Sequence, residues 1–304
     1  MSGFFDLQIN GFAGVDFQGH DLTRAQLEFA ATALRRHGME RILLTLITDS
    51  IESLEQKLRR IEGFCRENPT LTQTVVGYHI EGPYLCPELG FRGAHEAKWM
   101  KAPDRTEFDR LWSASGERIR LITLAPEWPG SAEFIQHAAE RGVRLSIGHS
   151  NADDSAIDAA IAAGLTFCTH LGNGVPAQMH RHDNVIQRLL ARDELFACFI
   201  PDGIHVPPST LKNFVRAKPK EKVLFTTDAM AAAGAPPGRY RIAHHDVEVG
   251  ADRVVRQPGS PLFAGSALTM DEAALNVNRF LQWTDADARA ACGARVAAAL
   301  GYPS

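Results

Sequence analysis

Four side chains able to support metal-assisted hydrolysis stand at the ends of apolar, strand-like runs. They are Glu81, His149, His170 and Asp228. Two imidazoles and one carboxylate, with a fourth position left for water, form a common catalytic zinc arrangement, and a zinc-bound water ionises near neutral pH. Glu81, His149 and His170 are therefore the expected metal ligands. Asp228 is the expected general base and acid, which takes a proton from the water and delivers it to the leaving amine.

The elements that must position these side chains follow a repeating pattern. Eight apolar, β-branched runs alternate with amphipathic stretches of helix length, which is typical of βα units around a parallel sheet. The predicted strands are Phe4 to Asn10, Arg41 to Ile47, Thr74 to Ile80, Ile119 to Leu124, Val143 to His149, Leu165 to His170, Leu195 to Ile200 and Val223 to Thr227. This α/β pattern predicts a (β/α)8 TIM barrel of the metal-dependent hydrolase type, whose C-terminal rim would bring the four side chains together. An open doubly wound sheet is the alternative, because periodicity does not show closure.

Two stretches interrupt the alternation. The segment from Gly82 to Pro103 is long for a βα connection, and such loops usually shape a site. The segment from Arg239 to Gln257 alternates apolar and polar residues around a turn at residues 250–252, so it predicts a small β-hairpin inserted after the eighth strand. Two helical patterns and a short tail are expected after Thr269.

Composition narrows the class of protein. The 304 residues suit one barrel domain over residues 1–304, and a net charge of -4 without a Lys/Arg cluster argues against nucleic acid as a partner. No apolar run reaches the length of a membrane span, so no membrane contact is expected. The five cysteines are widely spaced and form no C-x-x-C pair, which predicts a reducing, cytoplasmic location.

Eight ordered motifs carry a family resemblance between about residue 4 and about residue 276. They are Phe5-Asp6-Leu7-Gln8-Ile9-Asn10-Gly11, His79-Ile80-Glu81-Gly82-Pro83, Leu124-Ala125-Pro126-Glu127, Gly148-His149-Ser150-Asn151-Ala152, Thr169-His170-Leu171-Gly172-Asn173, Asp202-Gly203-Ile204-His205-Val206, Thr227-Asp228-Ala229 and Ala264-Gly265-Ser266-Ala267-Leu268-Thr269-Met270. In this order they resemble the signature segments of N-acetylglucosamine-6-phosphate deacetylases, in the amidohydrolase superfamily. The resemblance implies metal-dependent hydrolysis of N-acetylglucosamine 6-phosphate to glucosamine 6-phosphate and acetate.

The resemblance also assigns residues to the substrate, a small-molecule amino-sugar phosphate. Its implied contacts are His95, Asn173, Gly174, Arg181, His205, Ala264, Gly265 and Ser266. Arg181 resembles an arginine that reaches the phosphate, in the family usually across a dimer interface, and a guanidinium fork matches phosphate oxygens. A homodimer is expected for this reason.

Departures from the family pattern limit what the resemblance implies. Gln8 and Asn10 stand where many amidohydrolases place two metal-binding histidines, which predicts one divalent metal per chain. Zinc is the expected ion, although Glu and His ligands also accept Fe, Co or Mn. The family's small β-sandwich domain, made from both chain ends, is expected to be absent. Residues 172–176 read Gly-Asn-Gly-Val-Pro where the family usually has an aromatic residue followed by Asn-Ala-Met-Pro, so another N-acyl sugar or N-acyl metabolite is the alternative substrate.

A barrel that binds a sugar phosphate without catalysis is a third hypothesis, which the complete set of four polar residues argues against. Other polar residues have plainer interpretations. Cys168 is expected to be buried packing, His79 a core or supporting residue, and His244 and His245 exposed on the hairpin.

Overall fold

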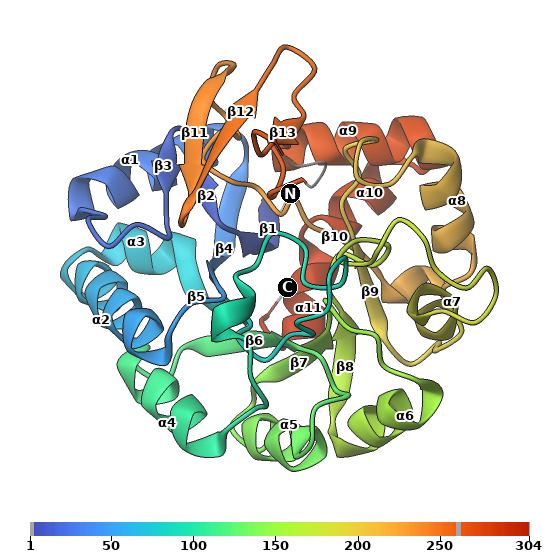
Figure 1. The fold of residues 1–304 in the computed structure, drawn as a ribbon. Helices are drawn as coiled ribbons and strands as arrows, with labels where there is room; N and C mark the ends of the chain where they lie inside the picture. The colour runs from blue at the N-terminus through green and yellow to red at the C-terminus, as the bar shows by residue number, and fades with distance from the viewer. Residues whose placement is uncertain (1–2, 260–262, 304) are drawn as a thin grey trace.

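Eight parallel strands form a barrel in the computed structural model, which describes residues 3–259 and 263–303 (Figure 1). Neighbouring strands follow the order of the chain, as the alternating pattern predicted. The strands are β1 (Phe4–Ile9), β4 (Met39–Ile47), β5 (Val75–Glu81), β6 (Ile119–Leu124), β7 (Arg144–Ile147), β8 (Leu165–Cys168), β9 (Phe196–Phe199) and β10 (Val223–Phe225). Each lies within two or three residues of the corresponding predicted run, so the predicted (β/α)8 barrel is confirmed.

The seam between β1 and β10 is closed mainly by side chains. A single parallel bridge joins Ile9 to Ala229, and the backbone N–H of Asn10 donates to the Ala229 carbonyl at 2.7 Å. Below this bridge, the buried carboxylate of Asp6 accepts hydrogen bonds from the hydroxyl groups of Thr226 and Thr227. Asp6 therefore fastens the first strand to the segment that carries Asp228.

Helices surround the barrel, and each helix buries one of its faces against it. The α-helices are α1 (Arg24–Arg36), α2 (Ile51–Glu67), α3 (Pro69–Thr74), α4 (Arg105–Ala114), α5 (Ser131–Ala139), α6 (Asp154–Ala163), α7 (Val185–Leu190), α8 (Pro208–Arg216), α9 (Met270–Leu281), α10 (Asp285–Ala291) and α11 (Ala294–Leu300), with 3-10 turns η1 (Ala97–Trp99) and η2 (Lys220–Lys222). In α1, a capping box of Thr23 and Gln26 satisfies the first turn, and the face with Leu27 and Leu34 is buried. Among the described residues, no helix is both long and apolar enough to cross a membrane.

The last helix forms the floor of the barrel. Val296 and Leu300 of α11 pack against Phe5 and Leu7 of β1 in a cluster that fills the N-terminal end of the barrel. The prediction of two helical patterns after Thr269 was wrong, because three helices follow. The alanine-rich stretch is broken at Gly293, where an added Cβ would lie 2.8 Å from the backbone oxygen of Gly3.

The predicted hairpin is a three-stranded antiparallel sheet. Its strands are β11 (Gly238–Ile242), β12 (His245–Val249) and β13 (Val255–Arg256), so the predicted turn at residues 250–252 joins the second strand to the third. The first turn lies at residues 243–244, where Ala243 has a φ of 51°. Two short strands, β2 (Gly11–Phe12) and β3 (Val15–Asp16), form another hairpin that the sequence pattern did not reveal. The three-stranded sheet stands beside the mouth of the barrel (Figure 1).

Candidate active site

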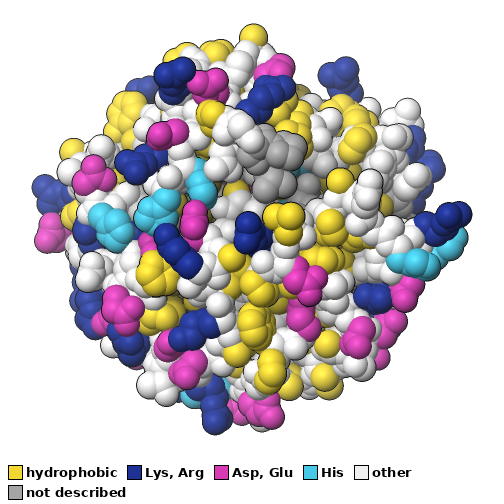
Figure 2. Space-filling view, in the orientation of Figure 1, with side chains coloured by type: hydrophobic (Ala, Val, Ile, Leu, Met, Phe, Trp, Pro, Cys, Tyr) yellow, Lys and Arg dark blue, Asp and Glu magenta, His cyan; other side chains and the backbone are white. Residues whose placement is uncertain are grey.

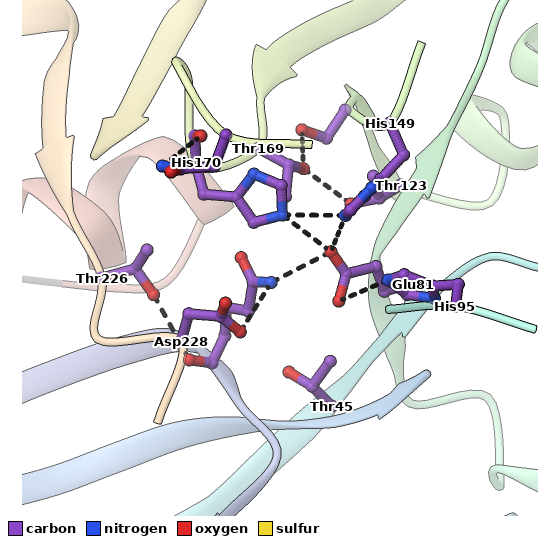
Figure 3. Close-up of polar contacts among 12 residues, drawn as sticks. Thr45, Glu81, His95, Thr123, His149, Thr169, His170, Thr226 and Asp228 are labelled. Atoms are coloured by element: carbon purple, nitrogen blue, oxygen red, sulfur yellow. Dashed lines mark hydrogen bonds and ion pairs between the residues drawn. The ribbon is translucent and has the colours of Figure 1, made fainter. Parts of the chain in front are cut away.

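The four predicted catalytic side chains meet at the C-terminal end of the barrel. Glu81 ends β5, His149 and His170 follow β7 and β8, and Asp228 follows β10. All four line one cavity of about 550 Å³. In Figure 3 the two histidines and Glu81 point toward one another, and Asp228 lies beside them.

Three atoms of this group have the spacing of metal ligands. His170 Nε2 lies 3.1 Å from Glu81 Oε1 and 3.1 Å from His149 Nε2, and His149 Nε2 lies 3.4 Å from Glu81 Oε1. Ligand atoms bound about 2.0 to 2.1 Å from a tetrahedral zinc ion are separated by about 3.3 Å. His149 Nδ1 is 2.8 Å from the Phe91 carbonyl oxygen, which only accepts, so Nδ1 carries the proton and Nε2 offers its lone pair.

His95 offers a second grouping of possible ligands. One ligand atom each from Glu81, His95 and His149 lie within 4.8 Å of one another. His95 Nε2 is, however, 4.0 Å from Glu81 Oε2, and the separations involving His170 are shorter. A metal ion fits the trio of Glu81, His149 and His170 better, with His95 at its edge.

Backbone strain marks the same positions. His149, His170 and Asp228 have positive φ angles of 51°, 26° and 50°. L-residues with side chains rarely adopt this region, and its cost of roughly 1–3 kcal/mol per residue persists mainly at functional sites. The turn at each of these positions places the side chain at the mouth of the barrel, where all three line the cavity.

Electrostatics keep Glu81 ionised inside the barrel. Complete burial alone would raise its pKa, but the imidazoles of His149 and His170 beside it hold the pKa well below its ordinary value. The pKa of His79, buried beneath the site, is lowered to about 4 by its burial. His79 hydrogen-bonds Thr123 at 2.8 Å and belongs to the packing below the rim.

Two amides hold the Asp228 carboxylate. Asn10 Nδ2 donates to Asp228 Oδ1 at 2.7 Å, and Gln8 Nε2 donates to the same oxygen at 3.1 Å. Gln8 Nε2 also lies 3.1 Å from Glu81 Oε1, so it bridges the two carboxylates with a nitrogen that is not a metal ligand. Burial, followed by the charge of Glu81, raises the pKa of Asp228 to about 7, which suits a group that must both accept and release a proton.

His95 is fixed by a contact that the sequence did not suggest. Its Nδ1 lies 2.9 Å from Thr48 Oγ1, and the Thr48 hydroxyl also lies 3.3 Å from the Glu81 carbonyl oxygen. Burial, together with the nearby His149, lowers the pKa of His95 to about 3, so its imidazole is neutral. Thr48 follows β4, and only the barrel places it beside a loop residue 47 positions further along the chain.

Most predicted substrate residues line the cavity. Asn173, Gly174, His205, Ala264 and Gly265 do so together with His95. The predicted long loop also shapes the site, because residues 90 and 93–95 form part of the wall.

Two predicted substrate residues are placed elsewhere. Ser266 is buried, and its hydroxyl donates to the Thr227 carbonyl at 2.5 Å, so it supports the segment before Asp228. Arg181 is exposed and is not part of the cavity wall formed by this chain.

The hairpin contributes residues that the sequence did not assign to the site. His244 is exposed as predicted, but His245 lines the cavity with only 17% of its side chain exposed, so the expectation of an exposed residue was wrong. Ile242 of β11 lines the same wall. An alternating hairpin next to the eighth strand could have suggested a wall residue, but not which face turns inward.

Comparisons with known proteins agree on one family. The chain is 31% identical over 289 residues to the N-acetylglucosamine-6-phosphate deacetylase of Bacillus subtilis, with 94% of this chain and 72% of the relative covered. It is 35% identical over 292 residues to the enzyme of that name from Mus musculus, with 93% and 69% covered. It is also 32% identical over 285 residues to the N-acetylgalactosamine-6-phosphate deacetylase of Escherichia coli O157:H7, with 94% and 74% covered. No family model matches the chain.

Solved structures give the same result. A mutant N-acetyl-D-glucosamine-6-phosphate deacetylase from Mycobacterium smegmatis, in complex with N-acetyl-D-glucosamine-6-phosphate, superposes with a TM-score of 0.89 at 30% identity, covering 100% of this chain and 78% of that one. The N-acetylglucosamine-6-phosphate deacetylase of Thermotoga maritima superposes with a TM-score of 0.87 at 26% identity, covering 99% and 78%. The similarity in sequence and fold, extending over nearly all of the described barrel, shows that the chain belongs to the N-acetylglucosamine-6-phosphate deacetylase family.

Proposed function

We propose that this protein hydrolyses the N-acetyl group of an amino-sugar phosphate, with N-acetylglucosamine 6-phosphate giving glucosamine 6-phosphate and acetate. The observation that carries the proposal is the close grouping of Glu81, His149 and His170, whose ligand atoms lie 3.1 to 3.4 Å apart beside Asp228. This arrangement suits hydrolysis of an unactivated amide, which needs an activated water and a proton for the amine.

We assign one divalent metal, zinc, to Glu81, His149 and His170. Their separations and the lone pair that Phe91 leaves on His149 Nε2 support this ligand set. When bound, the ion would act as a Lewis acid, lowering the pKa of a water molecule and polarising the acyl oxygen. Gln8 presents an amide nitrogen to the site, which supports a single ion.

Asp228 would move the proton. Its carboxylate takes a proton from the attacking water as the new C–O bond forms, and returns it to the nitrogen as the C–N bond breaks. Acetic acid and a free amine are formed, and transfer of the acid's proton to the amine gives acetate and an ammonium group, so atoms and charge balance. The amides of Gln8 and Asn10 donate hydrogen bonds to the carboxylate during both transfers, but neither amide gives up its proton.

His95 would orient the acyl oxygen. When the Thr48 hydroxyl turns from the Glu81 carbonyl oxygen and donates to Nδ1, the neutral imidazole carries its proton on Nε2, which can donate to a carbonyl oxygen. A donor placed where negative charge develops stabilises the transition state more than the substrate.

The sugar phosphate would lie against Asn173, Gly174 and His205. His205 Nδ1 is 2.6 Å from Asp202 Oδ2, which fixes the imidazole with Nε2 toward the cavity. Arg181, exposed and outside the cavity wall, would reach a phosphate only in a neighbouring chain, and we propose a homodimer for this reason. All five cysteines are free and buried, which supports the proposed cytoplasmic location, and one domain over residues 1–304 stays a prediction.

A second candidate substrate is N-acetylgalactosamine 6-phosphate. A relative at 32% identity carries that name, and the sugar-facing residues 172–176 differ from the usual family pattern. The two sugars differ only in the configuration of one hydroxyl group, so the choice depends on hydrogen bonds at the cavity wall.

The first experiment measures free-amine release from both N-acetyl hexosamine 6-phosphates and from unphosphorylated N-acetylglucosamine. Zinc-loaded protein is compared with chelated protein. We expect turnover of a phosphorylated sugar that chelation abolishes. Turnover that survives complete metal removal would refute the mechanism, and equal turnover with and without the phosphate would refute the proposed substrate class.

A further inference from the structure

The cavity has an apolar wall next to the proposed metal ligands. Ile47, Ala94 and Ile242 line it, and all three belong to one apolar cluster under the three-stranded sheet. Ile47 pairs with Glu81 across β4 and β5, and Ala94 precedes His95. The apolar wall therefore borders the reacting centre directly.

The opposite wall is made by residues after β8 and β9. It presents the amide of Asn173 and the imidazole of His205, together with apolar side chains that include Ile186 of α7. The carboxylate of Asp202, which holds His205, accepts two backbone N–H groups as well, from residues 204 and 205. Its pKa stays below the ordinary value despite burial, because His205 and these donors favour the charged form. This wall offers polar partners that the side chains of Ile47, Ala94 and Ile242 cannot offer.

The two walls suit the two sides of an N-acyl amino sugar. The amide carbon must lie between the proposed ligands and Asp228, so the sugar phosphate and the acyl chain extend in opposite directions. Hydroxyl and phosphate groups need hydrogen-bond partners, whereas burial of an acyl chain is favourable against apolar atoms alone.

We propose that Ile47, Ala94 and Ile242 form an acyl pocket that restricts the substrate to short N-acyl groups. This inference rests on the proposed function and identifies the inserted sheet as the element that sets acyl length. His245 bounds the pocket: its Nδ1 accepts from Gln257 Nε2 at 3.1 Å, and its Nε2 lies 3.5 Å from Glu96 Oε1. Figure 2 shows apolar side chains gathered near the centre of this face, with charged side chains between and around them.

The test compares two isoleucine variants on opposite walls. Ile242→Ala and Ile186→Ala delete the same atoms from residues that line the same cavity. Each is assayed with the N-acetyl, N-propionyl and N-butyryl derivatives of glucosamine 6-phosphate. One methylene in an apolar pocket changes kcat/KM by roughly 10-fold or more, so Ile242→Ala should raise the butyryl to acetyl ratio at least about 10-fold. Ile186→Ala should leave that ratio within about twofold of wild type.

Binding measurements and a variant with a smaller deletion than Ile242→Ala complete the test. Calorimetric affinities for the same acyl series, measured on Asp228→Asn, should change in parallel when Ile242→Ala is added. Ile47→Val, which removes one methyl group, should favour the propionyl derivative if Ile242→Ala does not fold. An unchanged ratio in a folded Ile242→Ala variant, or a larger change in Ile186→Ala, would overturn the pocket assignment. Wild-type protein inactive on every derivative would instead count against the proposed function.

Discussion

Gly82 directly follows the proposed ligand Glu81. Replacing it with alanine should destabilise the protein through two separable costs, one from the backbone conformation and one from a steric clash. Gly82 has a φ of 86°, and an added Cβ would lie 3.2 Å from Leu85 and closer than 3.0 Å to Thr48 Oγ1, a separation that real Cβ atoms essentially never show. The left-handed conformation alone costs a non-glycine residue roughly 1–2 kcal/mol. Overpacking against Thr48 should add roughly 1–3 kcal/mol.

Gly130 offers a matched control for the cost of the left-handed backbone conformation. It has a φ of 80°, and an added Cβ meets nothing within 4 Å. Gly130→Ala should therefore cost only about 1–2 kcal/mol, whereas Gly82→Ala should cost about 2–5 kcal/mol. The free energy of unfolding is measured by urea denaturation of chelated protein, so that metal binding does not add to the stability.

Thr48→Ala tests the steric part of this argument. Because it removes the atom that the new Cβ would meet, the double variant should be more stable than the two single costs predict, by about 0.5–3 kcal/mol. Gly82→Ala should also lose bound zinc, since Thr48 holds His95 and the Glu81 carbonyl. Strictly additive costs, or a Gly82→Ala variant as stable as Gly130→Ala, would refute the reasoning.

Further predictions concern catalysis, metal content and pH. Asp228→Asn should keep its metal but lose turnover by roughly 10²–10⁴-fold, and a fully active variant would contradict the role of Asp228. Elemental analysis should find one tightly bound divalent ion per chain in wild type and little in Glu81→Gln, while two ions in wild type would disprove the single-metal site. Burial raises the pKa of Asp6 from 3.8 to about 6, so the folded state keeps a proton that the unfolded chain has already lost. Wild-type stability should accordingly fall by about 3 kcal/mol relative to Asp6→Asn as pH rises from about 3 to about 7, and urea titrations in which both proteins respond alike would argue against this shift.

The barrel could be predicted because its local pattern is strong. The buried strands are continuous apolar runs, and polar residues follow them at the rim, so both the fold and the position of Glu81, His149, His170 and Asp228 could be read from the sequence. Strand ends differed by a few residues, partly because the predicted runs extended to His149 and His170, whose positive φ angles take them out of the strands. The third strand of the inserted sheet, only two residues long, is too short to produce a pattern.

Contacts between distant parts of the chain could not be predicted in this way. The hydrogen bond from His95 to Thr48 and the bridging position of Gln8 depend on how neighbouring strands align at the rim. The positive φ of His149 and Asp228 could not be predicted from residue type, because a sequence signals positive φ mainly by glycine and neither position has one. His245 was placed wrongly because a polar residue on a hairpin is exposed unless the hairpin lies against a cavity.

The position of α11 has a consequence for the order in which the barrel is completed during synthesis. Phe5 and Leu7 leave the ribosome first among the residues of this cluster, but their partners Val296 and Leu300 leave it last. Until then the N-terminal end of the barrel exposes aromatic and aliphatic side chains to water, a surface that favours aggregation. Nascent chains halted before residue 294 should therefore depend on chaperones more than the finished protein does.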